Sequence, residues 1–198
     1  MKEWKRNLTF VWIAELLAIM GFSSTFPIYA YYIQYLGVED HLVARWSGLV
    51  ISASSLSMGV MGPIWGALGD RYGRKIMVMR AMFGGAIIIG LMGFVESVEQ
   101  FALLRFIQGA LTGTVTAATA LVASTTPRER LGETLGKLQL AIFLGQAFGP
   151  TTGGFVADTL GYRATFWLTA AYLLVSGTLI ATQVHEAFTP SEAATQGT

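Results

Sequence analysis

Residues 46–75 read WSGLVISASSLSMGVMGPIWGALGDRYGRK, and this stretch indicates the kind of fold. No charged residue lies between Trp46 and Gly69, and a compact cluster of charges follows directly. A helix needs about 20 mostly apolar residues, at a rise of 1.5 Å each, to cross the roughly 30 Å hydrocarbon core of a bilayer. The stretch is therefore predicted to be a membrane-spanning helix that ends in a charged turn.

The rest of the chain repeats this pattern of long uncharged runs separated by charges. The runs are rich in Gly, Leu, Ala and Met and lack the polar–apolar alternation of outer-membrane strands. We therefore expect an all-α integral membrane protein with six transmembrane helices, near residues 8–35, 44–68, 76–95, 99–123, 135–157 and 163–184. Residues 1–187 would form one bundle, and residues 188–198, which are mostly small or polar, would begin a flexible linker.

The composition excludes several classes of protein. Of the 198 residues, 53% are hydrophobic and 13% charged, whereas about a quarter of a soluble domain is charged. The absence of cysteine excludes a disulfide scaffold, a thiol catalyst and a cysteine-based metal site. The net charge of +1 gives no basic surface for nucleic acid. No phosphate loop, serine-nucleophile motif or spaced cluster of metal ligands occurs, so we expect no enzyme, cofactor or metal site.

Lysine and arginine predict the orientation of the helices. If the N-terminus is cytoplasmic, the outer segments hold only Arg45 and Arg163. The inner segments then hold ten cations: Lys2, Lys5, Arg6, Arg71, Arg74, Lys75, Arg80, Arg128, Arg130 and Lys137. This asymmetry follows the positive-inside rule, and it predicts that both termini are cytoplasmic.

One sequence pattern occurs twice. Residues 62–74 read G-P-x-x-G-x-x-x-D-x-x-G-R, and residues 149–163 read G-P-x-x-G-x-x-x-x-D-x-x-G-x-R. Three predicted helices separate the copies, so the second copy faces the opposite side of the membrane. Such an inverted three-plus-three repeat is typical of secondary transporters.

Three motifs resemble those of the major facilitator superfamily. Residues 66–75, GALGDRYGRK, resemble its loop 2–3 signature, G-x-L-x-D-R-x-G-R-K. Residues 105–109, RFIQG, resemble its R-x-x-Q-G element, and residues 145–154 are similar to the G-x-x-x-G-P-x-x-G-G motif of its drug:proton antiporter branch. The stretches 4–8 and 37–48 further resemble bacterial multidrug efflux proteins of that branch.

The resemblance implies roles for two of these motifs. Family members have two six-helix halves, so this chain would be the N-terminal half and would need a C-terminal half or a second copy. The loop residues would form a conformational gate against that partner: Gly66, Asp70, Arg71, Gly73, Arg74 and Lys75. Taken alone, the same loop also fits a simple charged topogenic turn. The antiporter motif would bend a helix and seal the cavity against proton leak through Gly145, Gly149, Pro150, Gly153 and Gly154. Close helix packing explains the same glycines.

Glu15 is the one acid away from the ends of the predicted spans. Burying it ionised costs about 3 kcal/mol on insertion scales, and such groups usually mark proton or ion sites. The functional interpretation is a proton or cationic-drug site. The alternative is an interfacial acid, if the helix starts deeper than predicted.

Arg105 begins a polar stripe on the predicted helix 99–123. Gln108 and Thr112, followed by Thr116 and Thr119, recur at helical spacing on the same face. The resemblance makes Arg105 the proton-coupling arginine, and the alternative is an arginine that snorkels outward beside Glu99. The predicted depths of Glu15 and Arg105 differ by about 10 Å, which favours a water-linked relay over a direct ion pair.

Aromatic and amide side chains are further candidates for the substrate cavity. Phe22, Phe26 and Tyr29 share a face with Glu15 and could stack on flat cationic drugs. The alternative for the nearby aromatics, above all Tyr31, Tyr32 and Tyr35, is an interfacial belt. On the fifth helix, Gln139, Phe143 and Gln146 share another face.

Together with these residues, the resemblance implies a proton-coupled exporter of amphipathic or cationic drugs. It would work by alternating access in the bacterial inner membrane, with the proton gradient as its energy source. One alternative is a superfamily transporter of a metabolite, sugar or lipid. The other is a transport-inactive membrane fragment or assembly module.

Overall fold

The computed structural model describes residues 3–186 as helices joined by short turns, with no strand among them. The expected linker at residues 188–198 lies outside the described residues. The helices are α1 (Glu3–Thr25), η1 (Phe26–Ile28), α2 (Tyr29–Tyr35), α3 (Asp40–Tyr72), α4 (Arg74–Met92), α5 (Val98–Leu111), α6 (Thr114–Thr125), η2 (Arg128–Arg130), α7 (Leu131–Leu160) and α8 (Tyr162–Gln183).

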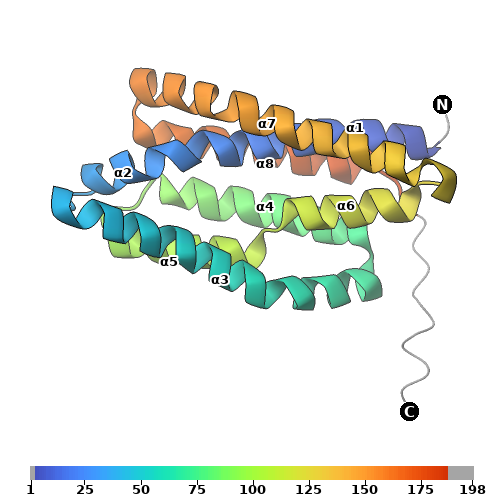
Figure 1. The fold of residues 1–198 in the computed structure, drawn as a ribbon, viewed down its shortest axis with the longest axis horizontal. Coiled ribbons are helices and arrows are strands. Elements are labelled where there is room, and N and C mark those ends of the chain that lie inside the picture. The colour runs from blue at the N-terminus through green and yellow to red at the C-terminus, as the bar shows by residue number, and fades with distance from the viewer. Residues whose placement is uncertain (1–2, 187–198) are drawn as a thin grey trace, which may run out of the picture.

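These elements form six spans that are long and apolar enough to cross a membrane. The spans are Glu3–Tyr35, Asp40–Tyr72, Arg74–Met92, Val98–Thr125, Arg128–Leu160 and Tyr162–Gln183. They lie side by side along one axis, and the start of α1 and the end of α8 lie at the same end of the bundle (Figure 1). Asn7 joins these two ends, because its amide donates to the His185 carbonyl at 2.6 Å and accepts from the His185 N–H at 3.1 Å.

The first three spans and the last three spans of this bundle pack in the same way. α1 packs against α7 and α8, and correspondingly α5 and α6 pack against α3 and α4, while α4 and α8 pack against each other. Exchanging the first three spans for the last three therefore preserves the packing pattern. The turns also correspond: Gly73 (φ 100°) joins α3 to α4, and Gly161 (φ 87°) joins α7 to α8. The fold is thus the expected inverted three-plus-three arrangement.

Two of the expected helices are not continuous. The helix expected at 99–123 breaks after Leu111, because Thr112 leaves the helical conformation and Gly113 adopts φ 111° and ψ 41°. Only glycine takes this left-handed conformation freely. The helix expected at 8–35 is interrupted by the 3-10 turn Phe26–Ile28, where Pro27 has no N–H to donate. Each interrupted helix still forms one span long and apolar enough to cross a membrane, as predicted.

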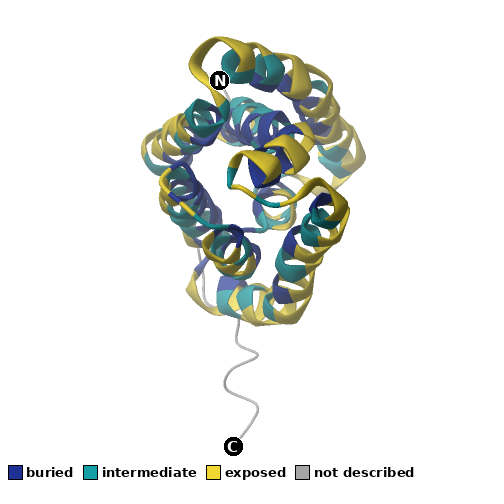
Figure 2. Cartoon of the chain, turned by 90° about the vertical axis from the view of Figure 1, so that its left-hand side faces the viewer, coloured by how far each residue is buried: buried dark blue, intermediate teal, exposed yellow. Residues whose placement is uncertain are grey.

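Burial is uneven across the bundle. Viewed along the helices, buried residues face inward and exposed residues line the outside (Figure 2). α3 is the least buried span and α7 the next, and these two helices correspond in the repeat. Large apolar side chains such as Leu56 on α3 (67% exposed) and Phe155 on α7 (70% exposed) point away from the bundle.

Candidate transport site

The glycines of the antiporter motif form the contact between α7 and α1. A Cβ on Gly145 would lie 2.9 Å from the carbonyl oxygen of Leu16, and one on Gly149 would lie 2.7 Å from that of Met20. A Cβ on Gly153 would overlap the carbonyl of Ser24. The fourth glycine, Gly154, faces open space, and Pro150 lies on the exposed side of α7. Glycine therefore permits the backbones of α1 and α7 to approach closely.

Glu15 precedes Leu16, the first residue of α1 in this contact. Its side chain is completely buried, and neither carboxylate oxygen has a hydrogen-bond partner among the residues that the structure describes. A buried carboxylate without donors is stable only as the neutral acid or beside a cation. Glu15 is thus not an exposed interfacial acid in this bundle.

Arg105 is held by side chains from three spans. The guanidinium donates from Nη2 to Ser54 Oγ of α3 at 2.8 Å and from Nη1 to Gln108 Oε1. Its central carbon lies 4.7 Å from the centroid of the Tyr29 ring of α2. Only 7% of Arg105 is exposed, so the side chain points into the protein and does not snorkel outward. Nothing in the sequence around Ser54 predicts its contact with Arg105.

Among the described residues, no ion pair neutralises Arg105. Within residues 3–186, the ion pairs do not include Arg105, so Glu15 and Arg105 are not directly bonded. Arg105 is therefore a buried cation held by neutral hydrogen-bond acceptors and an aromatic face.

The glycine of the R-x-x-Q-G element explains how Arg105 reaches Ser54. A Cβ on Gly109 would overlap both the Ser54 carbonyl and the Ser57 hydroxyl, and Ser57 donates to the carbonyl of Phe106 at 2.7 Å. The close contact of α3 and α5 places the Ser54 hydroxyl beside the guanidinium. Thr112, at the end of the stripe, is buried and donates to the Gln108 carbonyl at 2.8 Å. Past the break, Thr116 is exposed, so the stripe does not continue on one buried face.

The gate motif ties four spans together at one end of the bundle. Asp70 pairs with Arg74 at 3.2 Å, and Arg74 also donates to the carbonyl of Ala120 at 2.9 Å. Lys75 Nζ donates to the carbonyl of Ala181 at 2.8 Å. The carboxylate of Glu186 accepts from the backbone N–H groups of Arg74 (3.1 Å) and Lys75 (2.8 Å), and so caps α4.

Two of the three remaining gate residues are exposed. Arg71 is exposed and lies 5.3 Å from the ring centroid of Tyr72. Gly66 is exposed and has nothing within 4 Å of the position of a Cβ, whereas Gly73 is buried in the turn. Gly66, Asp70 and Arg71 are therefore the exposed gate residues of α3.

The aromatic candidates do not form one group. Tyr29 lies under Arg105, whereas Phe22 is half-buried and Phe26 is 58% exposed. Tyr31 and Tyr35 are exposed, as an interfacial belt requires, but Tyr32 is fully buried and donates to the carbonyl of Met92 at 2.7 Å. The belt interpretation is therefore wrong for Tyr32.

The candidates on α7 share an exposed face. Gln139, Phe143 and Gln146 are all exposed, on a side of α7 that this bundle does not cover. They do not contact Glu15 or Arg105 within this chain. They are placed to meet another bundle or lipid.

Comparison with known proteins identifies the family. The model of the Major Facilitator Superfamily matches residues 11–196. This chain belongs to that superfamily. Its curated relatives include the Multidrug resistance protein MdtG of Citrobacter koseri, 42% identical over 95% of this chain and 47% of that protein. Another is the MdtG of Klebsiella pneumoniae, 39% identical over 95% of this chain and 46% of that protein.

A solved structure shares the fold. The human organic anion transporter MFSD10 (TETRAN) superposes with a TM-score of 0.83 over 96% of this chain and 49% of that one, at 21% sequence identity. The chain thus spans about half the length of the curated relatives that it matches. The superfamily fold, the multi-pass membrane topology and the similarity to multidrug resistance proteins are established together.

Proposed function

We propose that this chain is the N-terminal half of a proton-coupled exporter of amphipathic or cationic drugs. The carrying observation is Glu15, a fully buried carboxylate without a hydrogen-bond partner among the described residues. Relatives about 40% identical are named multidrug resistance proteins. The helical-bundle fold and its repeat fit a transporter rather than an enzyme.

Exchange at Glu15 would couple transport of the drug to transport of the proton. With a proton on Glu15 the carboxyl group is neutral, which suits its apolar setting. A drug cation stabilises the ionised form, so the drug and the proton compete for the same carboxylate. Alternating access then follows if each ligand favours a different orientation of the two halves.

Arg105 would supply the fixed charge of this exchange. Ser54, Gln108 and Tyr29 hold its guanidinium without neutralising it. A fixed cation in the same half repels a drug cation and is balanced best when Glu15 is ionised. A proton leaving Glu15 would pass through water to the bulk solvent and not to Arg105, because the guanidinium is already protonated and accepts no proton.

The gate motif and the exposed helix faces would serve the movement of the halves. Asp70 and Arg71 lie at the end of α3, the span with the least burial within this chain. A second half would cover α3 and α7, and its rocking would make and break contacts at Asp70. With both termini cytoplasmic, in the bacterial inner membrane, the gate lies on the inner side.

A proton-release measurement tests this proposal. Ethidium is added to a purified two-half transporter containing this chain, in weakly buffered detergent solution, and the released protons are followed with a pH dye. We expect ethidium binding to release protons from the wild type and from Glu3→Gln, since Glu3 is exposed on the same helix. Glu15→Gln should bind ethidium without release. Equal proton release from Glu15→Gln would refute the role of Glu15.

A further inference from the structure

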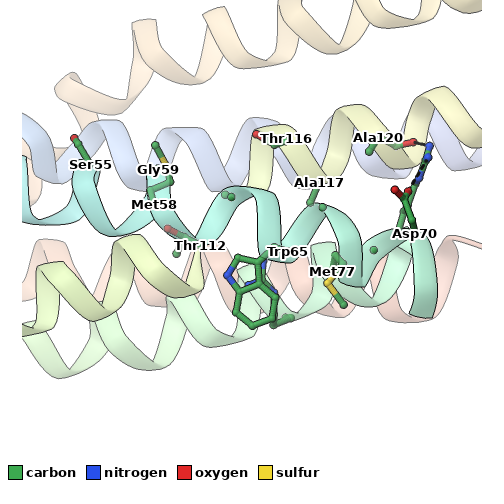
Figure 3. A pocket seen from close by; sticks show the side chains of 16 residues that line it. Ser55, Met58, Gly59, Trp65, Asp70, Met77, Thr112, Thr116, Ala117 and Ala120 are labelled. Atoms are coloured by element: carbon green, nitrogen blue, oxygen red, sulfur yellow. Dashed lines mark hydrogen bonds and ion pairs between the residues drawn. The ribbon is translucent and has the colours of Figure 1, made fainter. Parts of the chain in front are cut away.

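Thr114 begins α6 and lies inside the bundle. The threonines on either side of it in the sequence, Thr112 and Thr116, line a cavity between α3 and α6 (Figure 3). Thr114 is not among the residues that line this cavity, and only 3% of it is exposed. Besides α4, α6 packs against α1. Thr114 is therefore turned away from the face of α3 that a second half would cover.

The Thr114 hydroxyl faces the carboxylate of Glu15 on α1. Among the described residues it is the side-chain donor directed at that carboxylate. It does not reach the geometry of a hydrogen bond, so the carboxylate oxygens stay without a partner within residues 3–186. Glu15 is completely buried. The surroundings of its carboxylate are therefore formed by this chain alone.

The break at Gly113 gives α6 an uncapped N-terminus at this point. Gly113 adopts the left-handed conformation, and no side chain caps the helix. The first backbone hydrogen bond at this end runs from the Ala117 N–H to the Gly113 carbonyl at 3.2 Å. The N–H groups of residues 114–116 therefore have no partner in the helix. Such groups carry a partial positive charge and favour an anion.

The helices packed on α1 offer Glu15 no charged partner among the described residues. α6 has no ionisable side chain. The ionisable side chains of α7 and α8 are Glu133, Lys137, Asp158, Tyr162, Arg163 and Tyr172. The charged residues of α1 itself other than Glu15 are Glu3, Lys5 and Arg6, at its start. None of the ion pairs between described residues includes Glu15.

The two protonation states of Glu15 have different needs. The neutral acid tolerates an apolar setting, whereas a buried carboxylate requires donors or a cation. Hydrogen bonds to a carboxylate are also stronger than those to a neutral acid. Loss of the proton would therefore draw the carboxylate and the start of α6 together.

We propose that the start of α6 holds the ionised form of Glu15, through the Thr114 hydroxyl and the free N–H groups of residues 114–116. This inference rests on the proposed function, and it names what stabilises the carboxylate between release of the proton and arrival of the drug cation. Thr114 is thus a positioning residue that acts through Glu15. Because Gly113 links α6 to the helix that carries Arg105, ionisation of Glu15 would also shift α6 relative to α5.

An infrared pH titration of the purified chain tests the role of Thr114. The carboxylic-acid band of Glu15 is the band that Glu15→Gln removes, and its loss with rising pH measures ionisation. Thr114→Val keeps the size of the side chain and removes the donor, which disfavours the carboxylate. At a given pH the ratio of neutral to ionised Glu15 should therefore rise about tenfold, the order for a hydrogen bond to a charged group. The titration should move about one pH unit higher.

Two further variants separate the hydroxyl from the shape of the side chain. Thr114→Ser keeps the hydroxyl and should titrate like the wild type. Thr116→Val, at an exposed position of the same helix, is the matched control and should also titrate like the wild type. The proposal would be overturned by a Thr114→Val titration that matches the wild type, or by equal shifts in Thr114→Val and Thr114→Ser.

Amide hydrogen exchange tests the backbone donors and needs no change at Thr114. Above the pH at which Glu15 ionises, the amides of residues 114–116 should exchange severalfold more slowly in the wild type than in Glu15→Gln. Below that pH the two should exchange equally. The same exchange in both proteins at every pH would contradict the proposal.

These measurements can fail separately from the proposed function. Neither uses a drug or a proton gradient, so a negative result removes the start of α6 from the account and leaves proton–drug exchange at Glu15 to its own test. Conversely, a two-half transporter whose ethidium binding releases no proton from Glu15 would refute the exchange, while the titration shift in Thr114→Val would remain.

Discussion

The guanidinium of Arg105 lies over the ring of Tyr29, with its central carbon 4.7 Å from the ring centroid. The two residues belong to different spans, and Ser54 Oγ from a third span accepts a hydrogen bond from the same guanidinium at 2.8 Å. The buried charge therefore joins three spans at one point. Movement of any of these spans would alter the surroundings of Arg105, which is what coupling between a charge and a conformation requires.

Replacing the ring of Tyr29 should weaken transport, whereas removing its hydroxyl should not. Tyr29→Leu removes a cation–π contact worth about 0.5–2 kcal/mol, so ethidium export by a two-half transporter should fall severalfold. Tyr29→Phe keeps the aromatic face and loses only the 3.2 Å contact with Thr25, so export should stay near wild type. Equal defects in the two variants would assign the effect to the hydroxyl.

Alanine should be tolerated at Gly154 but not at Gly153. The Cβ at Gly153 would overlap the Ser24 carbonyl, whereas the Cβ at Gly154 meets nothing within 4 Å. Overpacking of this kind costs about 1–3 kcal/mol, so Gly153→Ala should lower the melting temperature of the purified chain by several degrees. Gly154→Ala is the control. If the two variants had the same melting temperature, the α1–α7 contact would not be as close as described.

Gly113→Ala should destabilise the chain through backbone strain and not through a steric clash. No atom lies within 4 Å of the Cβ position, but φ is +111°, so the change should cost about 1–2 kcal/mol. Gly59→Ala, also with open space but within α3, should be neutral or slightly stabilising. Thermal unfolding of the two variants checks this difference, and a stable Gly113→Ala would indicate a continuous fourth helix.

Glu186 should hold the start of α4. Its carboxylate accepts from the N–H groups of Arg74 and Lys75, and losing such a cap costs about 1 kcal/mol. In Glu186→Ala the exchange of these two amides should therefore accelerate about fivefold, as measured by hydrogen–deuterium exchange. Glu96→Ala, at an exposed turn, should leave them unchanged. Unaltered exchange in Glu186→Ala would show that other contacts hold the turn.

The number and class of the helices could be predicted because the bilayer fixes the length of each uncharged run. The close approach at Gly145, Gly149 and Gly153 could also be predicted, since glycine every fourth residue makes one smooth helix face. The break at Gly113 could not, because glycine is common inside membrane helices and only its backbone angles distinguish this one.

Contacts between residues of different helices could not be predicted from the sequence. Ser54 is one of several serines on α3, and only the α3–α5 contact selects it for Arg105. Nothing in the sequence around Arg80 indicates that Trp65, on another helix, offers its ring face to the guanidinium. Glu186 and His185 lie near the end of the described chain, and no local pattern relates them to Arg74 or Asn7.

The central claim is that Glu15 exchanges a proton for a cationic drug. Its most direct test is ethidium transport driven by a proton gradient in proteoliposomes that contain a two-half transporter with this chain. The account predicts protonophore-sensitive transport by the wild type and Glu3→Gln, and none by Glu15→Gln that is inserted and folded. Unchanged gradient-driven transport by Glu15→Gln would contradict it.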